Sequence, residues 1–292
     1  MIRLVPDWLL YIVVITVLVF VLFRVDQRQD APEALPDSPQ TGSFLPPPSQ
    51  YDPAVLVEVG PIASGLGSAF AISTDGWWLT ARHVVDGCDA VGLVVSRGAA
   101  VRVQEVKRAE FADIALLKTD SSFVPHTEDA EAPARRVLSL DTSERRFQIG
   151  QRAFHVGFPQ GRPGEAYSRL IGRETLIARG RYDLEEPVLA WAELGRTIGL
   201  RGSLAGISGG PALAANGQVI GITVAESARR GRIYTAAPSS ILRLLRVEQV
   251  EATGTPSERL TPNNYGQASD DMRRDLAVAQ VVCVAGEQAP AS

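Results

Sequence analysis

The chain has 292 residues, of which 45% are hydrophobic and 21% are charged, and its formal net charge is -4. This is the composition of a globular protein, and its mildly acidic balance argues against a nucleic-acid partner. The two cysteines, Cys88 and Cys283, form no CxxC pair, so a metal site is not expected either.

The N-terminal region contains a long apolar run. Residues 8–23, "WLLYIVVITVLVFVLF", carry no charge, and Val25 extends the run past Arg24. Such a run approaches the ~20 residues that span a bilayer. A cleaved signal peptide is the alternative, but "RVDQRQD" stands where a small-residue cleavage site would be. We therefore predict a transmembrane signal anchor at residues 8–25 in the lipid bilayer, with residues 1–7 in the cytoplasm.

The next segment is rich in proline. Seven prolines lie between Gln27 and Pro53, with no apolar periodicity. This pattern predicts a disordered linker at residues 26–53, and a plain spacer is favoured over a proline-rich recognition ligand.

From Val55 onward the chain reads as short apolar runs spaced by about ten residues, with "STDGW" and "AANGQ" as hairpin turns. This spacing is typical of antiparallel strands in a sandwich or barrel. Helical patterns are confined to "SSILRLLRV" and "SDDMRRDLAVA", where Ser269 is expected to cap the second helix. The sequence therefore predicts a mostly β fold.

The segment "GISGG", residues 206–210, matches the G-x-S-x-G nucleophile elbow of α/β-hydrolases. That fold requires a histidine after the serine in chain order. The three histidines, His83, His126 and His155, all precede Ser208. The α/β-hydrolase interpretation therefore fails.

The order His, Asp, Ser is instead that of chymotrypsin. His83 lies in "TARHVVDGC", Asp113 in "FADIALLK" and Ser208 in "GISGGP". Together with "GLGSAFAISTDGWWLTARHVV", "GFPQG", "GQVIGITV" and "IYTAAPSSIL", residues 65–245 resemble a chymotrypsin-fold serine peptidase, closest to the bacterial HtrA (Deg) branch.

The resemblance implies two antiparallel six-stranded β-barrels in a peptidase domain at residues 54–245, followed by a C-terminal extension at 246–292 with a helix and a strand. It also implies that the chain cleaves polypeptide substrates without a cofactor. Ser208 would be the nucleophile, His83 the general base and Asp113 the group that orients His83. The backbone amides of Gly206 and Ser208 would form the oxyanion hole.

Simpler interpretations of the same residues exist. Asp113 could be a surface residue that opens a strand, but His83 and Ser208 in register disfavour this. His155 lies inside the strand "RAFHVGF" and is expected to be a hydrogen-bonded core or rim histidine. His126, in "VPHTEDAE", is expected in an exposed loop.

Three departures from the family pattern stand out. Ile207 replaces the asparagine that HtrA enzymes usually carry before the serine, which leaves the stabilisation of that loop open. Fewer than fifty residues follow Leu245, too few for the PDZ module of HtrA enzymes. Gly202 at the expected base of the specificity pocket offers no charge. Glu226 is expected at a solvated strand end, and the alternative is that it reaches this pocket. A catalytically silent peptide-binding module on the same fold is the alternative function.

The compartment and the cysteines are linked. The resemblance and the anchor predict a bacterial inner-membrane protein whose peptidase domain lies in the periplasm, where disulfides form. Cys88 follows His83 by five residues, and Cys283 lies in the β-branched run "AQVVCVAG". We predict that this run is a strand appended to the first barrel and joined there by a Cys88–Cys283 disulfide. Two separate buried thiols are the alternative.

Overall fold

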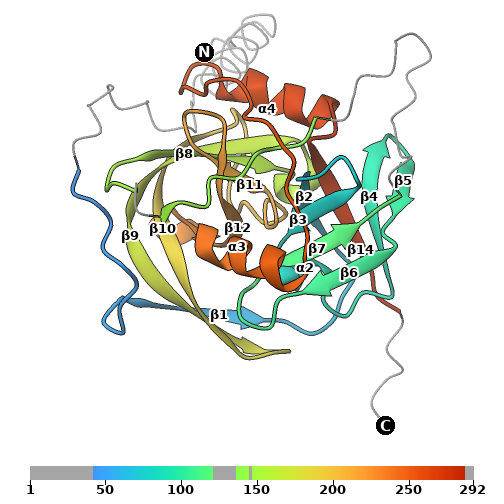
Figure 1. The fold of residues 1–292 in the computed structure, drawn as a ribbon, viewed down its shortest axis with the longest axis horizontal. Helices are drawn as coiled ribbons and strands as arrows, with labels where there is room; N and C mark the ends of the chain where they lie inside the picture. The colour runs from blue at the N-terminus through green and yellow to red at the C-terminus, as the bar shows by residue number, and fades with distance from the viewer. Residues whose placement is uncertain (1–41, 121–135, 145–146, 287–292) are drawn as a thin grey trace, which may run out of the picture.

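The computed structural model describes residues 42–120, 136–144 and 147–286. They form a mostly β, chymotrypsin-like fold of two seven-stranded sheets with few helices (Figure 1). The first sheet contains β2 (Gly65–Ala71), β3 (Trp77–Thr80), β4 (Ala90–Ser96), β5 (Ala99–Arg102), β6 (Glu105–Arg108), β7 (Ala115–Lys118) and β14 (Val278–Val284). The second contains β1 (Ala54–Val59), β8 (Arg152–Gly157), β9 (Gly164–Gly180), β10 (Leu184–Arg196), β11 (Pro211–Leu213), β12 (Val219–Ser227) and β13 (Arg232–Ala236). The helices are α2 (Arg82–Val85), α3 (Pro238–Val247) and α4 (Tyr265–Arg274), with 3-10 turns η2 (Pro159–Gly161) and η3 (Ala228–Arg230).

The first sheet closes on itself through a bend between β5 and β6. Its strand order is β5-β4-β14-β2-β3-β7-β6. At the bend, the Val103 amide donates to the Val91 carbonyl at 2.9 Å and the Gln104 amide donates to the Lys118 carbonyl at 2.8 Å. Adjacent residues thus pair with opposite edges of the sheet. Counted as one bent strand, β5 and β6 complete a six-stranded barrel.

The second sheet is a closed six-stranded ring with a seventh strand outside it. The pairing of β8 with β9 closes the order β9-β10-β13-β12-β11-β8. The six strands of the ring pair antiparallel, as expected, and β1, a strand that the expectation did not include, pairs with residues 175–180 of β9 in parallel. The reason is the length of β9. Residues 164–169 pair with β8, and the second half of the strand leaves an edge that β1 covers.

β14 is an integral strand rather than an appended one. It pairs with β2 on one side and with β4 on the other. The return of this strand to the first barrel is as predicted, but the expectation that the barrel is complete without it is wrong. The N-terminal strand β1 lies in the second sheet, so a strand from the end of the chain takes the position between β2 and β4.

The helices differ in how well the sequence placed them. α3 covers the expected segment, with Pro238 in its first turn. α4 begins at Tyr265, so Ser269 lies inside the helix, buried, instead of capping it. The helix starts a turn earlier because Tyr265 packs against the rings of Phe154 and Tyr167 at centroid distances of 5.5 and 6.2 Å.

Part of the predicted linker is ordered against the second barrel. The Leu45 amide donates to the Phe147 carbonyl at 2.8 Å, and the Ile149 amide donates to the Ser43 carbonyl at 2.9 Å. The apolar side chain of Leu45 also packs on the core of the second barrel, so this part of the predicted linker makes defined contacts.

The predicted anchor, residues 8–25, lies outside the described residues. Across the part of the chain that is described, no helix has the length and apolar character of a membrane span.

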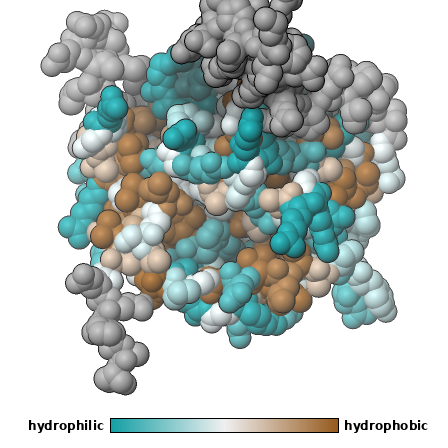
Figure 2. Space-filling model, turned by 180° about the vertical axis from the view of Figure 1, so that it is seen from behind, coloured by the Kyte–Doolittle hydropathy of each residue, from teal (hydrophilic) through white to brown (hydrophobic). Residues whose placement is uncertain are grey.

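The core consists of two hydrophobic clusters. The largest fully buried side chains include Trp78 and Phe70 in the first sheet and Trp191, Tyr234 and Phe154 in the second. On the face seen in Figure 2, hydrophobic patches alternate with hydrophilic residues. Both sheets thus contribute large side chains to the core.

Candidate active site

His83 and Asp113 lie side by side in the first barrel. His83 is in the single turn α2 that follows β3, and Asp113 comes just before β7. The His83 Nδ1 atom is 2.6 Å from Asp113 Oδ2, and the His83 backbone amide donates to Asp113 Oδ1 at 2.8 Å. Asp113 is buried, whereas 30% of the His83 side chain is exposed. The carboxylate therefore fixes the imidazole and leaves part of it accessible.

Two residues of the second barrel complete the surroundings of Asp113. Tyr182 lies at the tip of the β9–β10 hairpin, and its hydroxyl donates to Asp113 Oδ1 at 2.9 Å. Glu186, on β10, accepts a hydrogen bond from the Asp113 backbone amide at 2.7 Å. Sequence reasoning missed both residues. The sequence did indicate that Glu186 is buried, because it lies two residues from both Leu184 and Val188. Residues two apart in a strand share a face, so Glu186 falls on the core face of β10.

The charges around this pair shift its protonation. Burial lowers the pKa of His83, but the charge of Asp113 and its hydrogen bond raise it by more, so the net pKa lies above the ordinary 6.5. Burial, helped by the charge of Asp113, raises the pKa of Glu186 to about 8. The raised pKa favours the protonated form of Glu186 near neutral pH, so Glu186 adds little negative charge beside the His83–Asp113 pair.

Ser208 lies beside the start of α2. Its carbonyl accepts a hydrogen bond from the Ser68 amide of β2 at 2.8 Å. Gly209 has a φ of +87°, and a Cβ atom there would be 2.1 Å from the Ser68 carbonyl oxygen and 2.9 Å from the Ala81 amide nitrogen. Ala81 is the residue before α2. Only glycine fits this approach, which brings the loop of Ser208 against the backbone that leads into His83.

Within residues 204–210, the backbone amides are paired except at two positions. Those of Ile207 and Gly210 donate within the loop, that of Gly209 donates to Thr223, and those of Leu204 and Ala205 donate to side chains. Among the described residues, the Gly206 and Ser208 amides have no acceptor. Two unpaired N–H groups on alternate residues around a serine can bind an anionic oxygen.

Residues other than Ile207 form the side-chain hydrogen bonds that stabilise the loop of Ser208. The Ile207 side chain is buried in the core of the second barrel. The Glu226 carboxylate accepts a hydrogen bond from the Leu204 amide at 2.8 Å and another from the Ser203 hydroxyl. Glu226 was expected to be a solvated strand-end residue. It is half-buried instead and holds the segment before the serine.

His155 is remote from solvent, as expected for a core histidine. Its side chain is fully buried, with Nδ1 3.2 Å from the Thr223 hydroxyl and Nε2 2.7 Å from the Ser168 hydroxyl. Burial lowers the pKa of His155 to about 3. Ser168 is also fully buried, so this group has no access to a substrate. His126 lies outside the described residues.

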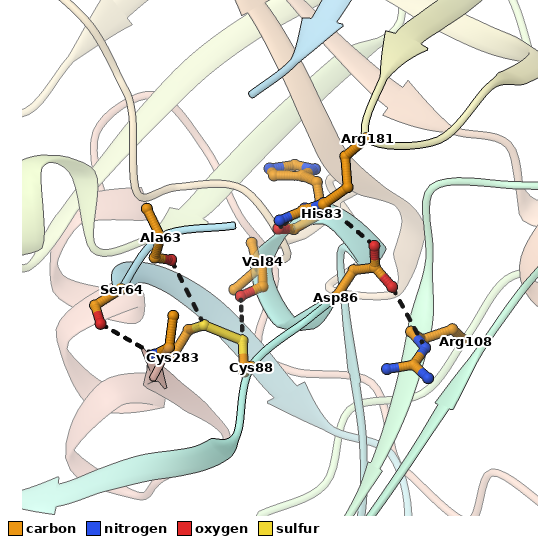
Figure 3. The surroundings of a disulfide bond; sticks show 10 residues. Ala63, Ser64, His83, Val84, Asp86, Cys88, Arg108, Arg181 and Cys283 are labelled. Atoms are coloured by element: carbon orange, nitrogen blue, oxygen red, sulfur yellow. Dashed lines mark hydrogen bonds and ion pairs between the residues drawn. A yellow bond between two sulfur atoms is a disulfide. The ribbon is translucent and has the colours of Figure 1, made fainter. Parts of the chain in front are cut away.

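A disulfide joins Cys88 and Cys283, with their Cα atoms 5.5 Å apart, as predicted (Figure 3). It connects β14 to the turn that follows α2, five residues beyond His83. Arg181 lies on the other side of His83 in Figure 3, donating to the His83 carbonyl at 3.1 Å and pairing with Asp86 at 3.2 Å. The backbone of α2 is thus held from both sides.

A cavity of about 330 Å³ opens next to His83 and Asp113. Its walls come from β1, from β9 and from the end of β12, and they combine apolar side chains with the charged groups of Arg181 and Glu226. Within residues 42–120, 136–144 and 147–286, no group of three or more His, Cys, Asp or Glu residues is arranged to hold a metal ion.

Two barrels, with the backbone that leads into His83 packed against the loop of Ser208, are the arrangement of the chymotrypsin-like class. Residues 67–222 match the model of the trypsin-like peptidase domain, and the chain belongs to this family of serine endopeptidases.

The chain is also similar to curated proteins described as probable periplasmic serine endoprotease DegP-like. It is 28% identical over 169 residues to the one from Pseudomonas putida (strain W619), covering 58% of this chain and 31% of that protein. It is 27% identical over 224 residues to the one from Brucella suis biovar 1 (strain 1330), covering 75% and 39%. The chain thus matches well under half the length of these relatives.

Solved structures with a similar fold have low identity. The HtrA-type protease AlgW with decapeptide is 20% identical, with a TM-score of 0.46, over 63% of this chain and 51% of that one. The active form of the Rv3671c protease from M. tuberculosis is 20% identical, with a TM-score of 0.45, over 66% and 77%. The MamO protease domain from Magnetospirillum magneticum is 20% identical, with a TM-score of 0.44, over 64% and 92%.

Proposed function

We propose that the chain is an active serine endopeptidase that cleaves polypeptides through Ser208, His83 and Asp113. His83 takes the proton of the Ser208 hydroxyl as Ser208 attacks the peptide carbonyl carbon, and then delivers it to the leaving amine. Water then attacks the acyl-enzyme. His83 takes a proton from this water as the base and returns it to the Ser208 oxygen as the acyl group leaves. Asp113 orients the imidazole and stabilises it while it is cationic.

The observation that carries this proposal is the pair of unpaired amides at Gly206 and Ser208. The tetrahedral intermediate carries a negative oxygen, and preorganised backbone donors stabilise it without reorganisation. In a silent binding module nothing would require these two amides to stay without an acceptor while their neighbours are paired.

Labelling with a fluorophosphonate probe tests the proposal. We expect the probe to modify Ser208 in the wild-type protein and to leave Ser208→Ala unmodified, and we expect Ser208→Ala to lose peptide hydrolysis while keeping its thermal unfolding temperature. A wild-type protein that stays unlabelled and binds peptides without cleaving them would instead be the silent module.

We further propose that residues 8–25 anchor the chain in the bacterial inner membrane with the peptidase domain, residues 54–245 and its C-terminal segment, in the periplasm. The uncharged run supports the anchor, and the disulfide and the periplasmic relatives support the compartment. The full chain should sediment with membranes in alkaline carbonate, and a chain that begins at Gly42 should stay in the supernatant. A mature N-terminus beyond residue 25 would identify a cleaved signal peptide instead.

A further inference from the structure

The direction of the Gly206 amide depends on the two peptide groups that flank this residue. A peptide bond is planar and trans, so its N–H and C=O point in opposite directions. Whatever binds the Ala205 carbonyl therefore aims the Gly206 N–H the other way. The described chain contains no cis peptide bond.

Both carbonyls around Gly206 are engaged. The Gln160 amide donates to the Ala205 carbonyl at 2.6 Å. The Ser68 hydroxyl donates to the Gly206 carbonyl at 2.8 Å and accepts a hydrogen bond from the Phe158 amide at 3.0 Å. With both planes fixed, the Gly206 N–H points away from the turn η2 and stays free.

The side chain of Gln160 adds a second hold on the same loop. Its Nε2 atom donates to the Arg201 carbonyl at 2.6 Å and to the Ser203 carbonyl at 2.8 Å. Gln160 has a φ of +53°, a conformation that glycine adopts more easily. A glutamine in this conformation is explained by the contacts that its side chain makes.

The packing around these residues is close. A Cβ atom on Gly206 would lie 2.6 Å from the Phe158 carbonyl oxygen, and one on Gly157 would lie 2.5 Å from the Ser68 hydroxyl. Ser68 itself is fully buried. The C-terminal elements support the turn η2, since Gln280 of β14 donates to the Gly161 carbonyl at 3.2 Å and Arg273 of α4 donates to the Gly164 carbonyl at 3.1 Å.

We propose that Ser68 and Gln160 are positioning residues that hold the Ala205–Gly206 peptide with its N–H directed at the substrate's developing oxyanion. This role rests on the proposed peptidase function and deepens it. The side chain of Ile207 cannot form hydrogen bonds. Glu226, Ser68 and Gln160 instead stabilise the loop of Ser208 through theirs.

The test compares Ser68→Ala and Gln160→Gly with two matched controls. Ser269→Ala removes another buried serine hydroxyl, one without a hydrogen-bond partner in the described structure. Gln249→Gly makes the same change at another glutamine with a positive φ, +55°, at the end of α3. Gln160→Gly keeps the backbone conformation of the turn, so it can fold even if Ser68→Ala cannot.

We expect kcat for a peptide substrate to fall at least about tenfold in Ser68→Ala and Gln160→Gly with KM within about twofold, because an oxyanion donor acts in the transition state. The pH at which the rate is half-maximal should not change, since the His83–Asp113 pair is untouched. Amide hydrogen exchange at Ile207 and at position 160 should be faster in both variants than in the controls.

If kcat and exchange in both variants match those of Ser269→Ala and Gln249→Gly, the proposal is wrong. The exchange measurement does not require activity. If the wild-type protein neither labels nor cleaves, the peptidase function fails, and unchanged exchange would overturn the positioning role separately.

Discussion

At the scale of single residues, the Asp113 carboxylate forms hydrogen bonds with residues of both barrels. It receives the His83 amide and imidazole from its own barrel and the Tyr182 hydroxyl from the other. The guanidinium of Arg82 lies 4.1 Å from the centre of the Tyr182 ring and helps to hold it. The Glu186 carboxyl accepts a hydrogen bond from the Asp113 backbone amide. These contacts suggest two separate tests, one catalytic and one thermodynamic.

Tyr182→Phe should reduce kcat about tenfold with little change in KM, because Asp113 loses a donor that holds its carboxylate in place against His83. The remaining carboxylate charge would act more strongly on His83, so the acid limb of the kcat/KM profile, which should already lie above pH 6.5, should move to higher pH. Tyr167→Phe is the control, because the buried Tyr167 hydroxyl has no partner within the described chain. An unshifted acid limb in Tyr182→Phe would contradict the expected coupling.

Glu186→Gln should change the pH dependence of stability. The folded-state pKa of Glu186, about 8, lies above the ordinary 4.5, so the folded protein holds a proton that the unfolded chain releases in this range. The stability due to the neutral carboxyl is complete below pH 4.5 and is lost as the pH rises toward 8. Urea unfolding at pH 5 and pH 9 should show a smaller decrease for Glu186→Gln than for the wild type. Equal decreases would mean that Glu186 ionises freely in the folded protein.

At the scale of elements, β14 joins the C-terminal region to the first barrel, which carries His83 and Asp113. Seen in Figure 1, this strand lies among the strands of the first barrel although it is last in the chain. It pairs along β2, which carries Ser68, and its Cys283 is bonded to the turn after α2. The C-terminal segment therefore contacts both the turn that follows α2 and the strand that carries Ser68.

Cys283→Ser should lower the free energy of unfolding by about 2–5 kcal/mol, because the bond closes a loop of 195 residues and restricts the unfolded chain. Denaturant unfolding checks this, and a reducing agent should destabilise the wild type to a similar degree without affecting Cys283→Ser. If reduction leaves the wild-type midpoint unchanged, the bond does not form in solution.

At the scale of the whole molecule, each sheet receives a strand from a distant part of the chain, but only the first barrel needs that strand for closure. β1 pairs with the second sheet, whereas β14 fills the first. Residues 54–245 alone would lack β14 and leave the facing edges of β2 and β4 unpaired. Unpaired interior edges leave buried backbone groups without partners and expose a template for aggregation.

A chain that ends at Leu245 should therefore fail to give a cooperative unfolding transition. A chain that ends at Gly286, after β14, should unfold at the same temperature as the longer protein. Calorimetry distinguishes these outcomes, and a stable, active chain ending at Leu245 would show that the first barrel closes without β14.

The sequence by itself determined the mostly β class, the exclusion of an α/β-hydrolase by histidine order, and the candidate residues His83, Asp113 and Ser208. It could do so because strand alternation, turn residues and nucleophile motifs are local patterns. The Cys88–Cys283 pair could also be inferred, since only two cysteines were available.

Only the tertiary structure decided which partners meet across the barrels. Tyr182, Glu186, Ser68 and Gln160 each act through a contact with a residue at least 41 positions away in the chain, and no local pattern encodes such a contact. The sequence also could not decide that β1 joins the second sheet and β14 the first, because both read as short apolar runs. Which edge each strand covers depends on the length of β9 and on the gap between β2 and β4, and these are properties of the assembled sheets.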